Sequence, residues 1–446
     1  MSDPRWLTTE QAAQLLGVKA ATVYAYVSRG QLTRHRGPDR RSSRFDRAEV
    51  ERVAARARRG GRAGALDVVL DTELTLLDPA GRLYFRGRDA TTLATRPFEQ
   101  VAELLWADPT ANAIADSTAN TAADATSDPT ADAIADPIGR PAPGGATGQA
   151  GPAAQGQPEA AGWAADERML AVVRAVQAAL PAGTPPADRF RVTVAALPAT
   201  DPFRYDQRPA AVAATGRGLI AAAIDALPRR STPVDDGIAA RLWAGCADRP
   251  PSPPELRAFD AALVLSADHE LAVSALAARV AASARADPYL AVLAGLAALG
   301  GGLHGGSVGA AEAMLAELAA GRTVADLVAD RFGAGDPVPG FGHAVYTGTD
   351  PRAEAVLRML DPDGPLAGRL GELVAAVGRH GGPRPNFDLA LGALAVTFGL
   401  APGSAEAVFV LGRCAGLLGH TIEEYRHRFR FRPRAVYVGT APSTPD

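Results

Sequence analysis

The sequence predicts a mainly α-helical protein, and three observations support this fold class. From residue 166 onward, apolar residues recur at helical spacing, and Pro and Gly divide them into segments of about ten to twenty residues. The alternation typical of β-strands is limited to short pieces at 67–77 and 435–438. A length of 446 residues allows about two or three domains around a large buried core. The expected helices cover 169–180, 217–227, 254–265, 272–286, 289–299, 310–320, 353–360 and 403–419.

Composition and cysteine content restrict the class of protein further. Hydrophobic residues make up 47% of the chain and charged residues 21%, an ordinary balance for a soluble protein. No apolar core follows the charged N-terminal residues, and the longest apolar stretch, at 289–299, is too short to span a membrane. The two cysteines, Cys246 and Cys414, are too few for a disulfide framework or a zinc site. We therefore expect a cytoplasmic protein without a membrane partner.

The N-terminal residues carry the pattern of a helix-turn-helix. Thr8 and Gln11 fit a capping box at the start of a short helix that covers 10–16. Gly17 supplies a tight turn, and a second helix is expected at 20–29. Two short helices joined by a turn with Gly are typical of modules that place the second helix in the major groove of DNA.

A basic hairpin follows the second helix. It is expected at 32–45, and Asp46 and Glu49 then begin a third helix that ends near residue 59. Residues 1–64 hold 14 Lys and Arg against 6 Asp and Glu, although the whole chain has a net charge of −3. Residues 1–62 resemble the winged helix-turn-helix of the excisionase and mercury-resistance-regulator type.

This head has two interpretations. In the first, it binds DNA, and arginines of the second helix and the hairpin contact phosphates. In the second, it is a relict or a protein-contact module whose arginines form a solvated face. The basic hairpin favours DNA as a partner. The candidate DNA-binding residues are Arg29, Arg34, Arg36, Arg40, Arg41 and Arg44.

Two segments of different character follow the head. Residues 65–106 have the pattern of folded structure, whereas 107–165 are low in complexity. The second segment repeats Ala, Asp, Thr and Pro in near-copies and continues with Gly, Pro and Gln. It has almost no large apolar side chains to offset the entropy cost of ordering, so we expect a disordered insertion without chemistry.

Three short segments in the second half place an ionisable side chain in a bend bounded by Gly or Pro. His304 follows a run of glycines that ends an apolar helix, and His343 stands in Pro-Gly-Phe-Gly-His. Asp388 stands in Pro-Asn-Phe-Asp. Bends of this kind are typical of ligand contact. Taken singly, the histidines could be structural hydrogen-bonding groups and Asp388 a helix cap.

Together with further motifs in the same order, these segments resemble the citrate synthase family. The resemblance covers nearly all of residues 65–446 apart from the insertion, and eight motifs in order are far more specific than one. The motifs are Phe85-Arg-Gly87, Ala267-Asp-His269-Glu with Ser274, Gly-Leu-His304-Gly-Gly, Pro339-Gly-Phe-Gly-His343 with Tyr346, Asp350-Pro-Arg352-Ala, Asn386-Phe-Asp388, Gly412-Arg413 with His420, and Arg432-Pro-Arg-Ala-Val-Tyr437.

The resemblance implies a role for each ionisable residue. A thioester α-CH is a weak acid, so its removal needs a positioned base together with a hydrogen-bond donor to the carbonyl oxygen. The family implies Asp388 as the base, His304 as the donor to the thioester oxygen, and His343 as the group that polarises and protonates the ketone of oxaloacetate. Oxaloacetate is a dianion, and the planar guanidinium of Arg pairs well with carboxylates. The implied oxaloacetate-binding residues are His269, Arg352, Arg413 and Arg432.

The resemblance also implies an architecture. We expect an all-α citrate synthase fold, with a large domain formed by 65–106, 166–302 and 385–446. A small domain at 303–384 would close over the substrates and exclude water before enolisation. The family implies a homodimer in which Arg432 reaches the partner's site, and it implies no metal or prosthetic group as a cofactor.

Substrate and function remain open between several alternatives. Ala344, Leu389 and Ser307-Val308 differ from residues common in the family, and each lies beside a proposed catalytic group. The expected acyl-CoA is acetyl-CoA, giving citrate, and the alternative is propionyl-CoA, giving 2-methylcitrate. A DNA-binding regulator that uses the same fold to sense a metabolite is an alternative of a different class. The presence of Asp388 and both central histidines favours the enzyme.

Overall fold

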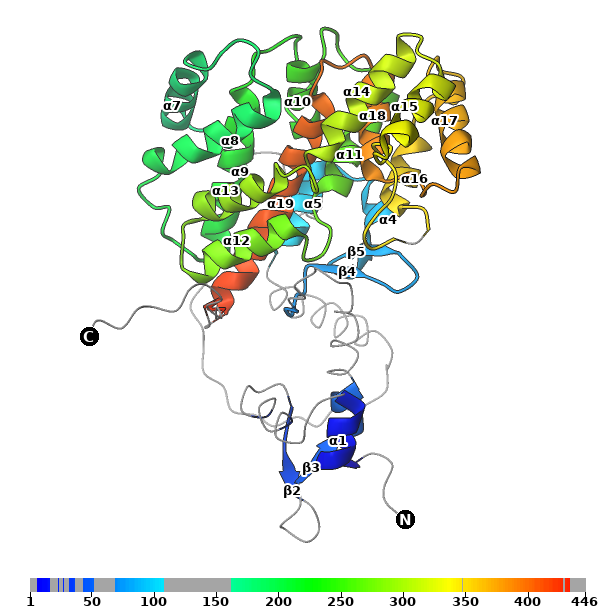
Figure 1. Cartoon of the computed structure of the whole chain (residues 1–446). Coiled ribbons are helices and arrows are strands. Elements are labelled where there is room, and N and C mark those ends of the chain that lie inside the picture. The colour runs from blue at the N-terminus through cyan, green and yellow to red at the C-terminus, as the bar shows by residue number, and fades with distance from the viewer. Residues whose placement is uncertain are drawn as a thin grey trace, which may run out of the picture. The chain divides into compact units, whose positions relative to one another are not determined.

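The computed structural model describes residues 6–16, 23, 27, 32–36, 43–51, 69–107, 162–346, 348–427 and 430–433. It divides into two compact units, Met1–Asp71 and Thr72–Asp446, both drawn in Figure 1. Residues 108–161 of the expected insertion at 107–165 lie outside the described residues, and so does the strand expected at 435–438. Residues 162–165 are described, and Trp163 is buried in the main core, stacked on Trp106.

The first unit has a small antiparallel sheet and a short helix. Its strands are β1 (Trp6–Thr8), β2 (His35–Arg36) and β3 (Ser43–Asp46), in the order β1-β3-β2. Helix α1 (Thr9–Leu16) follows β1 directly. The predicted capping box is confirmed: the Thr8 amide donates to Gln11 Oε1 at 2.9 Å, and the Gln11 amide donates to Thr8 Oγ1 at 3.3 Å. A cluster of apolar side chains holds the unit together: Leu7, Ala12, Ala13, Leu16, Val23, Leu32, Phe45 and Val50.

Strand β1 was not expected from the sequence, and this is a correction. It is only 3 residues long, so it shows no alternation that a pattern search could detect, and it forms because Leu7 pairs with Phe45 in the core. The predicted helix start at Asp46 is confirmed, since its carboxylate accepts the amides of Ala48 and Glu49. Most of the second helix lies outside the described residues.

The candidate DNA-binding arginines are therefore placed only in part. Arg34 is exposed just before β2, and Arg44 is half-buried on β3. Arg29, Arg40, Arg41 and the side chain of Arg36 lie outside the described residues. A role for these arginines on DNA stays a prediction.

The second unit is helical apart from one small antiparallel sheet. Its strands are β4 (Thr75–Leu77), β5 (Leu83–Phe85) and β6 (Arg88–Asp89), in that order. The helices are α4 (Ala90–Leu93), α5 (Phe98–Trp106), α7 (Glu167–Ala178), α8 (Pro186–Ala196), α9 (Pro209–Asp225), α10 (Ile238–Cys246), α11 (Pro253–Ser266), α12 (Val273–Ser283), α13 (Pro288–Leu299), α14 (Ser307–Ala319), α15 (Val324–Ala334), α16 (Pro351–Leu357), α17 (Ala367–Arg379), α18 (Phe387–Thr397) and α19 (Ser404–Arg426).

Each of the eight helix segments named between 169 and 419 is helical over most of its length, and the all-α class is confirmed. The ends differ where Pro begins a helix, because its fixed φ suits the first turn. Helix α9, for example, starts at Pro209, before the apolar pattern that begins at residue 217. Helix α18 was not among the named helices, although it carries Asp388.

Helix α19 is the centre of the second unit. Figure 1 shows it in orange-red, surrounded by other helices, and it packs against α5, α8, α9, α11, α12 and α13. By length and composition α19 could cross a membrane, but 94% of its apolar window is buried inside the structure. It is therefore a core helix. Cys414 of α19 is buried, as expected for a packing residue.

A second, smaller hydrophobic core lies beside the main one. Helices α14, α15, α17 and α18 supply its side chains, among them Leu315, Leu373 and Leu389. Ala353 and Val356 of α16 belong to the main core instead. Helix α18 contributes to both cores, so it joins the two lobes of this unit, and the side chains of its first turn lie between them.

Gly416 allows α19 to approach the segment that precedes the site. Its amide donates to the carbonyl of Ala267 at 3.1 Å, and a Cβ at this position would lie 2.1 Å from that oxygen. Gly416→Ala is therefore expected to lower the free energy of unfolding by about 3 kcal/mol. Gly371→Ala on α17, where a Cβ meets nothing within 4 Å, is the matched control and should be neutral or slightly stabilising. Equal melting temperatures for both variants would contradict this.

Candidate active site

One cavity of the second unit collects most of the predicted site residues. It has a volume of about 540 Å³ and is open to solvent, since the exposed side chains of Leu303 and Val345 line it. It lies between the main core and the smaller lobe, and five chain segments, within 269–273, 302–307, 337–352, 386–388 and 409–413, form its wall. The predicted residues that line it are His269, His304, His343, Arg352, Asp388 and Arg413.

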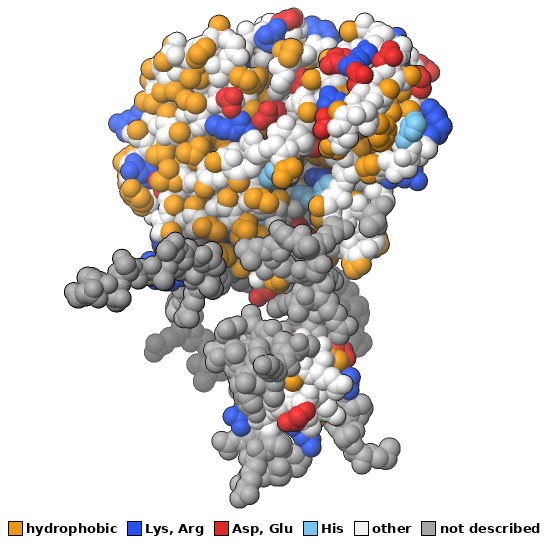
Figure 2. Space-filling view, viewed as in Figure 1, with side chains coloured by type: hydrophobic (Ala, Val, Ile, Leu, Met, Phe, Trp, Pro, Cys, Tyr) orange, Lys and Arg blue, Asp and Glu red, His pale blue; other side chains and the backbone are white. Residues whose placement is uncertain are grey.

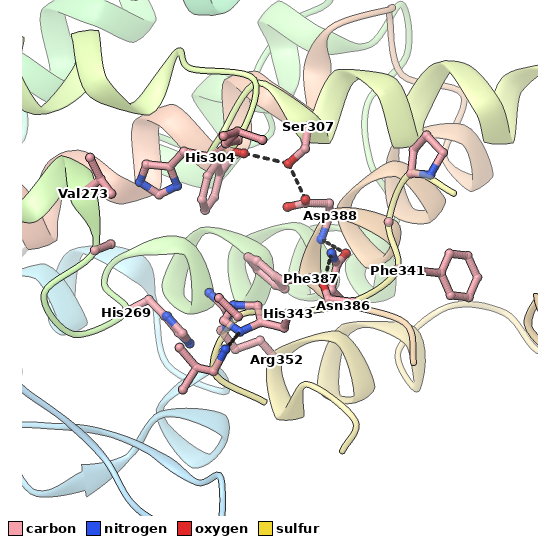
Figure 3. Close-up of a pocket in the computed structure, with 18 of the residues that line it drawn as sticks. His269, Val273, His304, Ser307, Phe341, His343, Arg352, Asn386, Phe387 and Asp388 are labelled. Carbon is pink, nitrogen blue, oxygen red and sulfur yellow. Dashed lines mark hydrogen bonds between the residues drawn. The ribbon is translucent and has the colours of Figure 1, made fainter. Parts of the chain in front are cut away.

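The site has two opposite walls. Figure 3 shows His304 and Asp388 on one side, joined through Ser307, with His269, His343 and Arg352 on the other. One wall thus offers a carboxylate and a neutral hydrogen-bond donor. The other offers imidazoles and the guanidinium group of Arg352, which suit a ketone with flanking carboxylates.

Asp388 is directed into the cavity from the first turn of α18 and is not the helix cap. The cap is Asn386, whose Oδ1 accepts the amides of Asp388 at 3.0 Å and Leu389 at 3.3 Å. The Asn386 amide group also donates to the Gly342 carbonyl at 2.8 Å, which fixes the α18 start against the loop that carries His343. Burial raises the pKa of Asp388, although the Ser307 hydroxyl and the charge of Arg352 oppose this. A raised pKa makes Asp388 a stronger base.

His304 is held by Ser274, and the contacts indicate its tautomer. Ser274 Oγ lies 2.9 Å from His304 Nε2 and accepts a long hydrogen bond of 3.5 Å from Arg413 Nη1. Because Arg can only donate, the serine proton is left for His304 Nε2, and His304 then carries its own proton on Nδ1. Burial lowers the pKa of His304 to about 4, so the ring is a neutral donor at pH 7.

His343 has a tautomer set by the backbone. Its Nδ1 accepts the amides of Val345 at 3.0 Å and Tyr346 at 3.3 Å, so the ring proton lies on Nε2. Burial, with the charge of Arg352, lowers its pKa to about 4. His343 is therefore a neutral donor as well, and in this form it can polarise an oxygen and then release a proton to it.

His269 packs beside His343 on the second wall. Their ring centroids are 5.0 Å apart, and His269 Nε2 shares a hydrogen bond of 2.9 Å with the Tyr346 hydroxyl. Burial, reinforced by Arg352, holds the pKa of His269 well below its usual value. Tyr346 thus positions an imidazole that the sequence assigned to substrate binding.

Two buried arginines supply positive charge to the cavity. Arg352 is only 4% exposed and forms a bidentate pair with Asp350, at 2.7 Å for Nη2 and 3.1 Å for Nε. Within the described residues its Nη1 has no hydrogen-bond partner, so this edge remains available to a ligand. Arg413 donates from Nε to the Ser266 carbonyl at 2.9 Å. Burial lowers the pKa of Arg413 to about 10, and it stays cationic at neutral pH.

A buried polar group supports the segment before His269. Asp268 accepts from Thr75 Oγ1 at 2.5 Å and lies 3.2 Å from His420 Nε2. Burial works against its charge, but His420 and Arg413 hold the pKa of Asp268 below the usual value. The motif residues Asp268 and His420 therefore support the wall from behind and do not line the cavity.

Arg432 is the one predicted oxaloacetate residue that this chain does not bring to the cavity. It is exposed in the segment 430–433, where the Phe431 amide donates to Ser283 Oγ at 3.3 Å at the end of α12. Its proposed role in a partner's site stays a prediction.

Sequence reasoning missed the contacts made by three residues. It noted Ser307 only as a departure from the family and did not assign its hydrogen bond to Asp388. It likewise did not pair Asp350 with Arg352 or Tyr346 with His269. The sequence did contain a signal for the Ser307 contact. Ser307 stands three residues after His304, at the start of the next helix, so its hydroxyl lies near the end of the loop that carries His304.

The fold of the second unit is that of solved citrate synthases. The citrate synthase of Thermoplasma acidophilum, solved as a ternary complex with carboxymethyl coenzyme A and oxaloacetate, aligns with a TM-score of 0.61 at 24% identity, over 84% of this chain and 95% of that one. The Pyrobaculum aerophilum enzyme aligns with a TM-score of 0.60 at 23% identity, over 85% and 92%. At such identities the likeness concerns the fold.

The sequence comparisons define the family. Residues 66–434 match the family described as citrate synthase, C-terminal domain, and residues 6–58 match the helix-turn-helix domain. The chain therefore belongs to the citrate synthase family and carries an N-terminal helix-turn-helix domain.

Individual relatives differ in name and in coverage. The citrate synthase of Saccharolobus solfataricus is 36% identical over 48% of this chain and 59% of its own length. The 2-methylcitrate synthase of Mycobacterium tuberculosis is 27% identical over 84% and 90%. Among the first curated relatives the chain spans about half their length, for example 57% of citrate synthase 2 of Bacillus subtilis. The names leave the acyl group open.

Proposed function

We propose that the protein condenses a short acyl-CoA with oxaloacetate and releases CoA, as a synthase of citrate or 2-methylcitrate. The observation that carries this proposal is the two-walled cavity. A buried carboxylate and a neutral imidazole donor face a second imidazole donor and the buried guanidinium group of Arg352 across one open space, and Arg413 also lines this space. This is the set of groups that enolisation of a thioester beside a bound keto-dicarboxylate requires.

In the first proposed step, Asp388 takes a proton from the α-carbon of the thioester. The C–H electron pair forms the C=C bond of the enol, and the carbonyl π pair moves to the oxygen. His304 Nδ1–H donates to that oxygen and stabilises its developing charge. Asp388 suits this step because burial raises its pKa, while Ser307 and Arg352 oppose that shift and favour the ionised form.

In the second proposed step, the enol carbon attacks the ketone carbon of oxaloacetate and forms the C–C bond. His343 Nε2–H polarises the ketone oxygen and donates its proton to the resulting alkoxide. Arg352, Arg413 and His269 hold the dianion in this orientation. Water then cleaves the thioester bond and releases CoA. No step requires a metal or prosthetic group.

The experiment that tests the proposal is thiol release by the purified full chain with oxaloacetate and either acetyl-CoA or propionyl-CoA. Release that depends on both substrates is the expected result, and the thioester with the larger kcat/KM identifies the acyl group. If a folded protein releases no thiol with either one, the enzyme proposal fails. A DNA-binding metabolite sensor then becomes the leading hypothesis, with the helix-turn-helix domain as its DNA-binding part.

We also infer that the protein forms a homodimer through α12 and α13. Leu276, Ala277, Val280, Ala281 and Ala284 follow helical spacing along α12, and each is exposed or half-buried within one chain. Figure 2 shows apolar side chains gathered over the part of the second unit that contains these helices. An uncovered apolar stripe of this kind favours association with a second apolar surface.

The occupant we propose for this stripe is a second copy of the chain. A two-fold interface pairs the same patch on both partners, so α12 and α13 would meet their own counterparts. Arg432 lies next to the end of α12, because the neighbouring Phe431 amide is bonded to Ser283. Pairing through α12 therefore places Arg432 beside a partner, in agreement with the role that the resemblance implies for it.

Val280→Glu tests this interface. A carboxylate buried without a partner in an apolar contact is expected to weaken dimerisation by about 100-fold or more, and the variant should elute as a monomer in light-scattering chromatography. Val234→Glu, at an exposed loop position with 49% exposure against 44% for Val280, is the matched control and should leave the mass unchanged. A dimeric Val280→Glu would exclude α12 as the interface.

A further inference from the structure

Ser307 links the two groups proposed to enolise the thioester. It is the first residue of α14, and its Oγ lies 2.5 Å from Asp388 Oδ2 and 2.6 Å from the backbone carbonyl of His304. Both contacts are visible as dashed lines in Figure 3. We propose that Ser307 is a positioning residue that alternates between them, donating to Asp388 while the base is ionised and to the His304 carbonyl once Asp388 holds the proton. This inference rests on the proposed function.

The count of protons supports the alternation. A serine hydroxyl has one proton to donate, but both of its neighbours here are acceptors, a carboxylate and a carbonyl. A hydrogen bond to an ionised carboxylate is about twice as strong as one between neutral groups. The proton therefore lies on the Asp388 side while Asp388 is charged, and the His304 carbonyl offers it a second position when that charge is neutralised.

The contact also orients the base. Ser307 holds Oδ2, and within the described residues Oδ1 has no hydrogen-bond partner. Figure 3 shows the carboxylate of Asp388 directed into the cavity on the side of His304. Oδ1 is therefore the oxygen left for the substrate proton. The Asn386 cap fixes the backbone of the same residue, so the side chain is held at both ends.

The electrostatic consequence has a definite sign. Burial raises the pKa of Asp388, and the Ser307 hydroxyl lowers it because the hydroxyl stabilises the ionised form. Removal of the hydroxyl should therefore raise the pKa of Asp388 further. Since the base must be ionised to act, the acid limb of activity should move to higher pH in Ser307→Ala.

Two measurements on Ser307→Ala test the inference. The first is a difference infrared titration of the unliganded full chain, with the carboxylic acid band of Asp388 assigned by its loss in Asp388→Asn. The second is the pH profile of kcat/KM for the acyl-CoA. Both midpoints are expected to rise by about one to two pH units, the size of one lost hydrogen bond to a charged group. The KM for oxaloacetate should not change, because Ser307 is on the opposite wall.

Ser307→Thr keeps the hydroxyl and should return both midpoints to the wild-type values. If lost packing alone caused the shift in Ser307→Ala, restoring a hydroxyl would not reverse it. If Ser307→Ala does not fold, Ser307→Cys replaces it, since a thiol is a weak donor and should also raise the midpoint. Midpoints that coincide in wild type and Ser307→Ala would overturn the inference. A wild-type protein without thiol release would sink the proposed function instead, and the infrared titration would still report the Ser307–Asp388 contact.

Discussion

Asp388→Asn is expected to lower oxaloacetate-dependent release of CoA by about 1,000-fold or more. The amide has the shape of the carboxylate and can still bond to Ser307, but it cannot accept the α-proton of a thioester. The fold should survive, because the cap of α18 is Asn386 and the residue-388 side chain is not part of it. Thiol release in steady state is the measurement, with circular dichroism and melting temperature as checks on folding.

Asp363→Asn is the matched control for this substitution. Asp363 is an exposed carboxylate in the loop before α17, outside the residues that line the cavity, and its replacement should leave kcat unchanged. If Asp388→Asn retained more than about a tenth of the wild-type rate, a proton acceptor other than Asp388 would be required, since general-base catalysis alone contributes about 100-fold or more.

Arg352→Met is expected to damage both substrate binding and stability. Removal of a cation that pairs with a carboxylate should raise the KM for oxaloacetate by about 100-fold. The methionine still packs on Phe387, over whose ring the guanidinium lies at 4.7 Å. Asp350, however, is only 1% exposed and would keep its charge without the guanidinium that pairs with it, at a cost of about 3–5 kcal/mol.

The stability defect of Arg352→Met should depend on pH in a direction that identifies its cause. In the wild type, burial opposes the charge of Asp350, but Arg352 holds the pKa of this carboxyl below 3.8. The pair therefore stabilises the fold above pH 3.8. This stabilisation is lost as pH falls through the lowered pKa of the folded state. In the variant, the guanidinium is gone and only His343 and the backbone amide of residue 352 still oppose burial, so the pKa of Asp350 rises. The difference in melting temperature from wild type should therefore be largest at neutral pH and shrink as pH falls through the raised pKa of Asp350.

The double variant Asp350→Asn with Arg352→Met separates the two effects. It removes the buried charge, so it should recover part of the melting temperature while the KM for oxaloacetate stays high. A single variant whose defect did not change with pH would show that lost packing, and not the unpaired carboxylate, causes the instability.

Much of the fold and of the candidate site was predictable because it depends on the pattern of residues that are close together in the sequence. The helical periodicity around 254–265 and 289–299 corresponds to α11 and α13, since each buries an apolar face. The order of the short motifs identified the residues that line the cavity. Strand β1 was not predictable from periodicity, because its pairing with β3 decides it. The start of α9 was not predictable from periodicity either, because a Pro in the first turn decides it.

The sequence by itself determined the helical class, the family and the identity of the ionisable residues, since these depend on residue type and order along the chain. The tertiary structure alone decided how those residues act on one another. Burial and short distances decide three features of the site. These are the tautomers of His304 and His343, the pairing of Arg352 with Asp350 and the contact of Ser307 with Asp388. Such interactions fall steeply with separation and strengthen in a low dielectric, so they depend on packing that spacing along the chain does not specify.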